Sequence, residues 1–188
     1  MLQTRFRPAA VVAASLLLTL TACGGGGSED SADGGSGGDM AGMDMSAMNE
    51  PDATPADEVD GDVEEGEFVV LDTAPPGSDE VAGEAFLAQD DDGTTVTIRL
   101  IGLEPGVEYV SHLHDAACTD GDGGDHFKFD PAGGDLPPNE VHLGFTATEQ
   151  GTGMATVTND QRVEDGAPSI VVHPAEATDN RLACADFS

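Results

Sequence analysis

The stretch that decides the fold covers residues 91–114 and reads DDGTTVTIRLIGLEPGVEYVSHLH. It contains two β-type runs, residues 94–103 and 107–114, and its opening Asp-Asp-Gly is typical of a hairpin loop. Alternate residues of a strand point to one face of the sheet. We therefore expect the side chains of His112 and His114 to lie together on one face of a strand.

Short runs of the same kind continue from residue 67 to residue 187, separated by Gly, Pro and Asp. No segment shows a sustained 3.6-residue apolar period, so few or no helices are expected. A further hairpin loop is expected at residues 149–153. Eight candidate strands predict an all-β antiparallel sandwich or barrel. These strands are residues 67–72, 81–88, 94–103, 107–114, 141–148, 154–158, 169–172 and 182–187.

The first 22 residues predict an export signal, because Arg5 and Arg7 precede an apolar run that ends in small residues. The run is shorter than the roughly 20 residues that a membrane-spanning helix needs. Its ending, LTAC at residues 20–23, resembles a bacterial lipobox and predicts lipidation of Cys23. The alternative is an ordinary cleaved signal followed by a chance cysteine.

The three cysteines support the lipoprotein interpretation. An odd cysteine in an exported protein needs an explanation. If Cys23 carries lipid, Cys118 and Cys184 remain as one pair, and an oxidising compartment permits a disulfide between them. Such a link would stabilise the fold by roughly 4 kcal/mol in the chain-entropy description.

Residues 23–66 are rich in Gly, Ser, Asp, Ala and Glu, and we expect them to form a disordered tether that precedes a folded domain at residues 67–188. Four of the six methionines cluster in the tether. Thioether sulfur is a soft ligand that suits Cu(I), so copper capture is one interpretation and a methionine-biased linker is the other. The clustered methionines are Met40, Met43, Met45 and Met48.

The charge balance excludes one class of partner. The chain has 37 acidic and six basic residues, for a formal net charge of −31. A surface this acidic repels nucleic acid, so no nucleic-acid partner is expected. Most of the carboxylates are explained by solubility outside the cell.

Histidines carry the chemistry of this sequence. Imidazole binds both oxidation states of copper, and a set of nitrogen ligands suits Cu(II). The long stretch 115–140 has no strand pattern, yet it carries Cys118 and one histidine, and a loop of that length is usually functional or disordered. The candidate copper ligands are His112, His114, His126 and His173.

In their order and approximate spacing, these motifs resemble the copper/zinc superoxide dismutase family from about residue 67 onward. The resemblance implies an eight-stranded Greek-key barrel with two functional loops. It also implies four copper ligands among the histidines, a disulfide between Cys118 and Cys184, and an arginine, Arg181, that attracts and orients the anionic substrate beside the copper. His126 is implied as a further catalytic residue.

Two departures indicate the copper-only branch of that family. The family's zinc site needs three histidines and an aspartate, whereas the candidates here are His126, His142 and Asp135, and Ala132 stands where another histidine is expected. We therefore expect the zinc site to be lost and His142 to be structural rather than a ligand. Only seven residues separate His173 from Arg181, so the copper face is expected to be more open.

In the copper-only branch His126 bridges nothing, and its free ring nitrogen could hydrogen-bond to an acid such as Asp125 or Glu140. The Asp/Gly tract at residues 120–125 lacks a proper calcium-ligand register, and we interpret it as a solvated acidic loop.

The resemblance implies a superoxide dismutase that converts superoxide to oxygen and hydrogen peroxide by Cu(II)/Cu(I) cycling. The alternative is a non-enzymatic copper-binding lipoprotein for sequestration or delivery, which the methionines and the acidic surface favour. A metal-free structural module is a third possibility, and the complete histidine set argues against it. The expected location is the outer face of the bacterial cytoplasmic membrane, held by the lipid, with a copper donor as a further partner. The sequence leaves the oligomeric state open.

Overall fold

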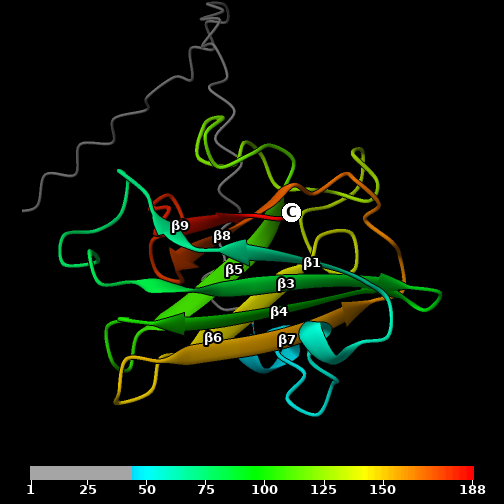
Figure 1. The fold of residues 1–188 in the computed structure, drawn as a ribbon. Helices are drawn as coiled ribbons and strands as arrows, with labels where there is room; N and C mark the ends of the chain where they lie inside the picture. The colour runs from blue at the N-terminus through cyan, green and yellow to red at the C-terminus, as the bar shows by residue number, and fades with distance from the viewer. Residues whose placement is uncertain (1–43) are drawn as a thin grey trace, which may run out of the picture. The chain divides into compact units, whose positions relative to one another are not determined.

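The computed structural model describes residues 44–188 (Figure 1). The predicted signal segment, Cys23, Met40 and Met43 lie outside the described residues. Within them, two short 3-10 helices, η1 (Met45–Met48) and η2 (Ala56–Glu58), precede and flank the first strand, and none of the helices is long and apolar enough to cross a membrane. The strands are β1 (Asp62–Glu67), β2 (Val69–Val70), β3 (Ala82–Asp90), β4 (Gly93–Ile101), β5 (Glu108–His114), β6 (His142–Thr146), β7 (Gly153–Asn159), β8 (Ser169–Pro174) and β9 (Ala183–Asp186).

The strands form two antiparallel sheets, which confirms the all-β prediction. One sheet has the order β1-β3-β4-β7, and the other has the order β2-β9-β8-β5-β6. Figure 1 shows the four-stranded sheet in front of most of the five-stranded sheet. The pairs β4·β7 and β5·β8 join strands that are far apart in the sequence. The Greek-key connectivity stays a prediction.

The core lies between the two sheets because each strand turns alternate side chains inward. On β5, Tyr109 and Leu113 belong to this core, so the histidines at the intervening positions face the opposite side. The same alternation on β8 buries Ile170 and Val172 in the core and leaves His173 on the outer face. The outer face of the five-stranded sheet therefore carries the histidines.

Two details of the strand prediction are wrong. Residues 44–188 contain nine strands rather than eight, because the expected strand at residues 67–72 is replaced by the end of β1 and the two-residue β2. The segment 149–153 is not a hairpin loop, since β6 and β7 belong to different sheets. The hairpin at residues 90–93 is confirmed, with Asp90 opposite Gly93.

The predicted tether extends too far toward the C-terminus. Residues 44–60, which we call the N-terminal strap, pack on the sheets, and β1 pairs with β3 over six residues. The strap covers the open edge of β7, where Glu50 N donates to Thr156 O at 2.7 Å. Asp57 forms an ion pair with Arg99 at 2.8 Å on the outer face of the four-stranded sheet. In Figure 1 the strap is the cyan segment below and beside β7.

Candidate metal centre

Two neighbouring strands supply three of the predicted histidines. His112 and His114 lie on β5, and His173 lies on β8 opposite Val110. The register places His173 diagonally across from His112, and their ring centroids are 5.4 Å apart. All three side chains are buried on the same outer face.

The fourth histidine comes from the long loop between β5 and β6. His126 forms an isolated antiparallel bridge with His114, which is supported by a hydrogen bond from Phe127 N to Leu113 O at 2.9 Å. This bridge brings the His126 ring to 4.1 Å from the His112 ring, centroid to centroid. One nitrogen from each of the four predicted histidines then lies within 4.8 Å of the others. The structure thus assembles a group that could hold a metal ion.

Hydrogen bonds fix which nitrogen three of the rings offer. The Nδ1–H groups of His114, His126 and His173 donate to Gly124 O at 3.2 Å, to Glu140 Oε2 at 2.9 Å and to Thr178 O at 2.6 Å. Because a carbonyl or carboxylate oxygen can only accept, each of these Nε2 atoms carries the lone pair. Oxygen partners of this kind orient metal-binding imidazoles in proteins.

Several ring nitrogens of the cluster are buried without a partner. These are His114 Nε2, His173 Nε2 and both nitrogens of His112. A buried polar atom without a hydrogen bond is costly, and such atoms need an explanation. A metal ion bound at their centre would satisfy one nitrogen of each ring, so the donor set fits a metal. His126 lies at the rim of the cluster, and its side chain is 23% exposed.

Burial holds three of the clustered rings, His112, His114 and His173, in the neutral form. Desolvation, followed by the neighbouring histidines, lowers the pKa of His112 well below its usual 6.5. The pKa of His114 falls to about 3 and that of His173 to about 4, mainly because of burial, with the Arg181 charge contributing to both. Neutral imidazoles are the form that binds metals.

The metal-free protein is expected to lose stability as the pH falls below 6.5. Between the unfolded pKa of about 6.5 and the folded values of about 3 and 4, the unfolded chain binds more protons, so acid favours unfolding. One group shifted from 6.5 to about 4 corresponds to about 3 kcal/mol. The measurement is the free energy of unfolding by denaturant between pH 8 and pH 4.5.

Salt provides the control for this pH profile. At about 0.5 M salt the repulsion among surface carboxylates is screened, while the buried histidines keep their effect. Glu140 adds to the pH dependence of stability only below its unfolded pKa of 4.5, because its folded pKa is about 2. A flat profile between pH 7 and pH 4.5 would contradict the buried neutral histidines.

Glu140 is the buried acid behind the cluster, and it confirms one of the two predicted partners of His126. Its side chain is 2% exposed, and its Oε2 accepts hydrogen bonds from His126 and from His142, both at 2.9 Å. Burial by itself raises the pKa of Glu140, but these two hydrogen bonds more than offset that effect, and the pKa falls to about 2. The other candidate, Asp125, donates a hydrogen bond from its backbone N–H to Asp115 Oδ1.

The two remaining zinc candidates do not join the cluster. His142 turns its Nε2 to Glu140, and Asp135 pairs with Lys128. Neither belongs to the metal-capable groups of residues 44–188. Sequence reasoning missed Lys128, whose Nζ also lies 3.7 Å from Glu140 Oε1. It also missed the His142–Glu140 contact, although their spacing of two residues is the signal that could have indicated it.

Arg181 is held beside the cluster by backbone carbonyls. Its guanidinium donates to Gly121 O at 2.8 Å, Asp122 O at 2.9 Å and Gly124 O at 2.8 Å. Four consecutive residues, 121–124, have positive φ, which curls these carbonyls around the guanidinium. A Cβ at Gly123 would lie 2.9 Å from a methyl group of Val171, so this position needs glycine. The Asp/Gly tract is thus a cradle for an arginine.

Arg181 also has a free charge. Among the lysines and arginines of residues 44–188, Arg99, Lys128 and Arg162 each pair with a carboxylate, whereas Arg181 has none within 4.0 Å. Its partners are neutral carbonyl oxygens. The positive field beside the histidine cluster is therefore available to an anion.

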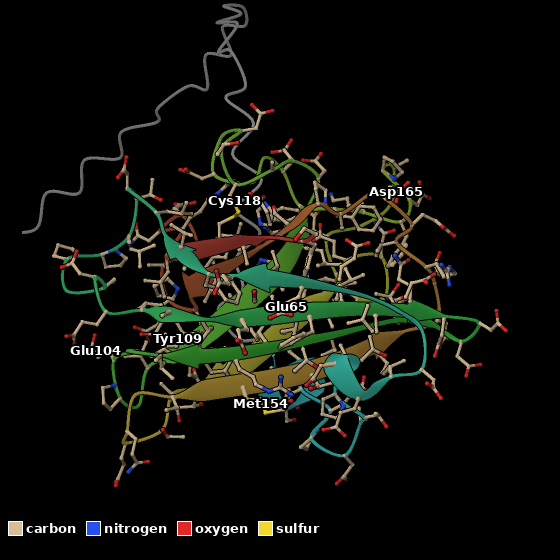
Figure 2. The ribbon with its side chains drawn as sticks, viewed as in Figure 1. Glu65, Glu104, Tyr109, Cys118, Met154 and Asp165 are labelled. Carbon is tan, nitrogen blue, oxygen red and sulfur yellow. A yellow bond between two sulfur atoms is a disulfide. The ribbon has the colours of Figure 1, made fainter. Side chains whose placement is uncertain are left out.

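A disulfide ties the long loop to the sheet, as predicted. Cys118 and Cys184 are bonded across a separation of 66 residues, and Cys118 N donates to Asp186 Oδ1 at 2.7 Å. Cys184 lies on β9, opposite Val171 of β8. The yellow bond beside the Cys118 label in Figure 2 marks this link. The loop that supplies His126 and the arginine cradle is thereby fixed at its start.

The described part of the methionine cluster packs against β6. Met48 is 2% exposed, and Met45 is half-buried. A Cβ at Gly144 would lie 2.9 Å from Met45 Cε and 3.3 Å from Met48 Sδ, so the glycine leaves room for both side chains. Met48 thus packs against β6, and copper capture by the methionine cluster stays a prediction.

Comparison with protein family models and comparison with solved structures give different results. No protein family model matches the chain. Among solved structures, the chain is similar to the Cu/Zn superoxide dismutase from Brucella abortus, with 20% sequence identity and a TM-score of 0.48. That alignment covers 68% of this chain and 100% of the other chain.

Proposed function

We propose that this protein is a copper-dependent superoxide dismutase that works outside the cytoplasm. The observation that carries the proposal is a cluster of four imidazoles whose unpartnered nitrogens converge beside an arginine with no carboxylate partner. The order of the histidine, cysteine and arginine motifs in the sequence supports the same assignment.

Copper is the metal that suits this activity. A bound copper ion would supply one-electron chemistry by alternating between Cu(II) and Cu(I), so that one superoxide is oxidised to oxygen and a second is reduced to hydrogen peroxide with proton uptake. Zinc has no second oxidation state to offer. Four imidazoles are donors that suit both copper states.

The protein's own residues would bind and orient the substrate. Superoxide is a small anion, and the guanidinium of Arg181 is permanently charged and offers several donors. The carbonyls of the cradle hold that guanidinium in one place next to the cluster. His126 is the partly exposed ring, so the substrate would approach on its side.

The acidic surface makes this local charge more important. With a formal net charge of −31, the chain as a whole repels an anionic substrate. Attraction must therefore come from the immediate surroundings of the cluster, where Arg181 stands without a neutralising partner. The acidic exterior does not need to attract the substrate if the electrostatic potential next to the cluster is positive.

The same proposal places the protein on the outer face of the cytoplasmic membrane. Its support is the signal-like first 22 residues and the lipobox-like sequence at residues 20–23. Anchoring through Cys23 would leave the folded domain facing the compartment in which the disulfide between Cys118 and Cys184 is stable.

The test is superoxide decay followed by stopped-flow absorbance. The full exported protein is loaded with copper alone, zinc alone, or both metals. We expect fast decay whenever copper is present, no requirement for zinc, and no activity with zinc alone. Copper-loaded protein that leaves the decay unchanged would overturn the enzyme assignment. Copper binding without decay would favour the alternative of a copper-binding lipoprotein.

Replacement of Arg181 by Ala is expected to slow superoxide removal by about tenfold and to weaken its dependence on ionic strength. The reason is the loss of the unpaired positive charge beside the cluster. The measurement is the rate at several salt concentrations, with metal content determined for each sample.

The matched control is Arg162→Ala, because Arg162 is a surface arginine paired with Glu164 at 3.3 Å. This control should leave both the rate and its salt dependence near wild type. Equal effects of the two substitutions would show that Arg181 contributes only general charge.

A further inference from the structure

The two histidines that donate to Glu140 differ in how firmly the fold holds them. His126 lies in the long loop 115–141, which has no strand of its own apart from the isolated bridge at His114. His142 lies on β6 directly opposite His112, in a regular antiparallel pair. A side chain on a paired strand is positioned more firmly than one on a loop.

His142 is enclosed on this strand. Its side chain is fully buried, and its ring packs edge-on against the ring of His112 at 4.5 Å between centroids. This packing fixes the ring plane and directs Nε2 toward Glu140 Oε2, 2.9 Å away. Because the carboxylate accepts, His142 donates the hydrogen.

The same carboxylate oxygen receives the hydrogen bond from His126. Glu140 therefore connects a strand-borne donor to a loop-borne ring. Its other oxygen, Oε1, is buried and has no hydrogen-bond partner, and Lys128 Nζ is 3.7 Å from it. The orientation of the carboxylate thus depends chiefly on the two imidazole donors.

A buried carboxylate is costly unless it is well supplied with donors. If the donor of His142 is removed, Glu140 keeps one hydrogen bond and can turn about its side-chain torsions to seek others. The ring of His126 would then lose a fixed partner for Nδ1. Its Nε2, which faces the other three rings, would be less well aimed.

We propose that His142 is a positioning residue, which orients Glu140 and through it the metal-facing nitrogen of His126. The role rests on the proposed function, because it gives His126 its place in the metal site. In this role, His142 neither binds the metal nor merely fills space in the protein. It also explains how a loop-borne ring can be held without a second metal to bridge to.

A set of three substitutions tests this role. In His142→Gln the amide nitrogen can occupy the place of Nε2, whereas in His142→Asn the amide is shorter and cannot reach Glu140, and His142→Leu has no donor. Gln and Asn have the same chemistry and differ by one methylene, so they form a matched pair.

Two readouts separate positioning from simple folding. The first is the hydrogen-bonded Nδ1–H proton signal of His126 in the metal-free protein, observed by NMR. The second is the copper dissociation constant, together with the Cu(II) electron paramagnetic resonance spectrum. We expect wild-type behaviour for Gln, and for Asn and Leu a lost proton signal, an altered spectrum and a dissociation constant raised by about tenfold, in keeping with other outer partners of metal ligands.

The outcomes are decisive in both directions. Rescue by Gln and not by Asn supports the role. Equal loss in Gln and Asn, or wild-type behaviour in all three variants, overturns it. If wild-type protein binds copper without removing superoxide, the proposed function fails, while the NMR signal and the dissociation constant still decide the role of His142.

Discussion

Replacement of His112 by Ala is expected to abolish tight copper binding and, with it, superoxide removal. His112 is the central ring of the cluster, with centroids 4.1 Å from His126 and 5.4 Å from His173. Neither of its nitrogens has a hydrogen-bond partner. Loss of an outer partner of a metal ligand weakens binding by about 10- to 100-fold, so loss of the ligand itself should exceed 100-fold.

Thermal unfolding with and without copper measures this effect independently of activity. A ligand present at 1,000 times its dissociation constant stabilises a protein by about 4 kcal/mol. The wild type should gain this stabilisation and His112→Ala should not. The metal-free forms are the control, because the substitution also removes two buried, unpartnered nitrogens and so is not expected to unfold the domain. A variant that still gains stability from copper would contradict the assignment of His112.

Removal of the disulfide is the second large effect, and here the expected loss is of stability. The bond closes a separation of 66 residues, and restricting the unfolded chain over such a length stabilises the fold by about 4 kcal/mol. The double substitution of Cys118 and Cys184 by Ala should lower the free energy of unfolding by about this amount. Denaturant titration measures it, and wild-type protein unfolded in reducing agent is the matched comparison.

The disulfide also has a second, local consequence. Cys118 begins the loop that supplies the carbonyls around Arg181 and the ring of His126. We therefore expect the double variant to lose more superoxide removal than its copper content accounts for. If the double variant and the reduced wild type both unfold at the wild-type denaturant concentration, the disulfide has no role in stability.

Local sequence pattern was sufficient where the structure depends on strand alternation. His112 and His114 stand two residues apart on a strand, and the structure places both on one face. The boundaries of most strands follow from the same alternation and from the turns between them. The pairing of Cys118 with Cys184 was also predicted correctly, because only two cysteines remained after Cys23 was set aside.

Composition misled where main-chain hydrogen bonds hold a polar segment. Residues 44–66 contain few large apolar residues, yet β1 pairs with β3, and Ser188 N donates to Glu65 O at 3.2 Å. Figure 2 shows Glu65 on this outer strand. An edge strand needs few buried side chains of its own, because the neighbouring strand supplies the hydrogen bonds.

The amino-acid sequence alone determined which residue types carry the chemistry and which of them share a strand face, since both depend on contacts over a few residues. Only the tertiary structure decided that Glu140, rather than Asp125, accepts a hydrogen bond from His126, and that the carbonyls of Gly121, Asp122 and Gly124 accept from Arg181. The guanidinium and these carbonyls lie 57 to 60 residues apart in the chain. Contacts at such distances are set by sheet register and loop path, which no short pattern of residues contains.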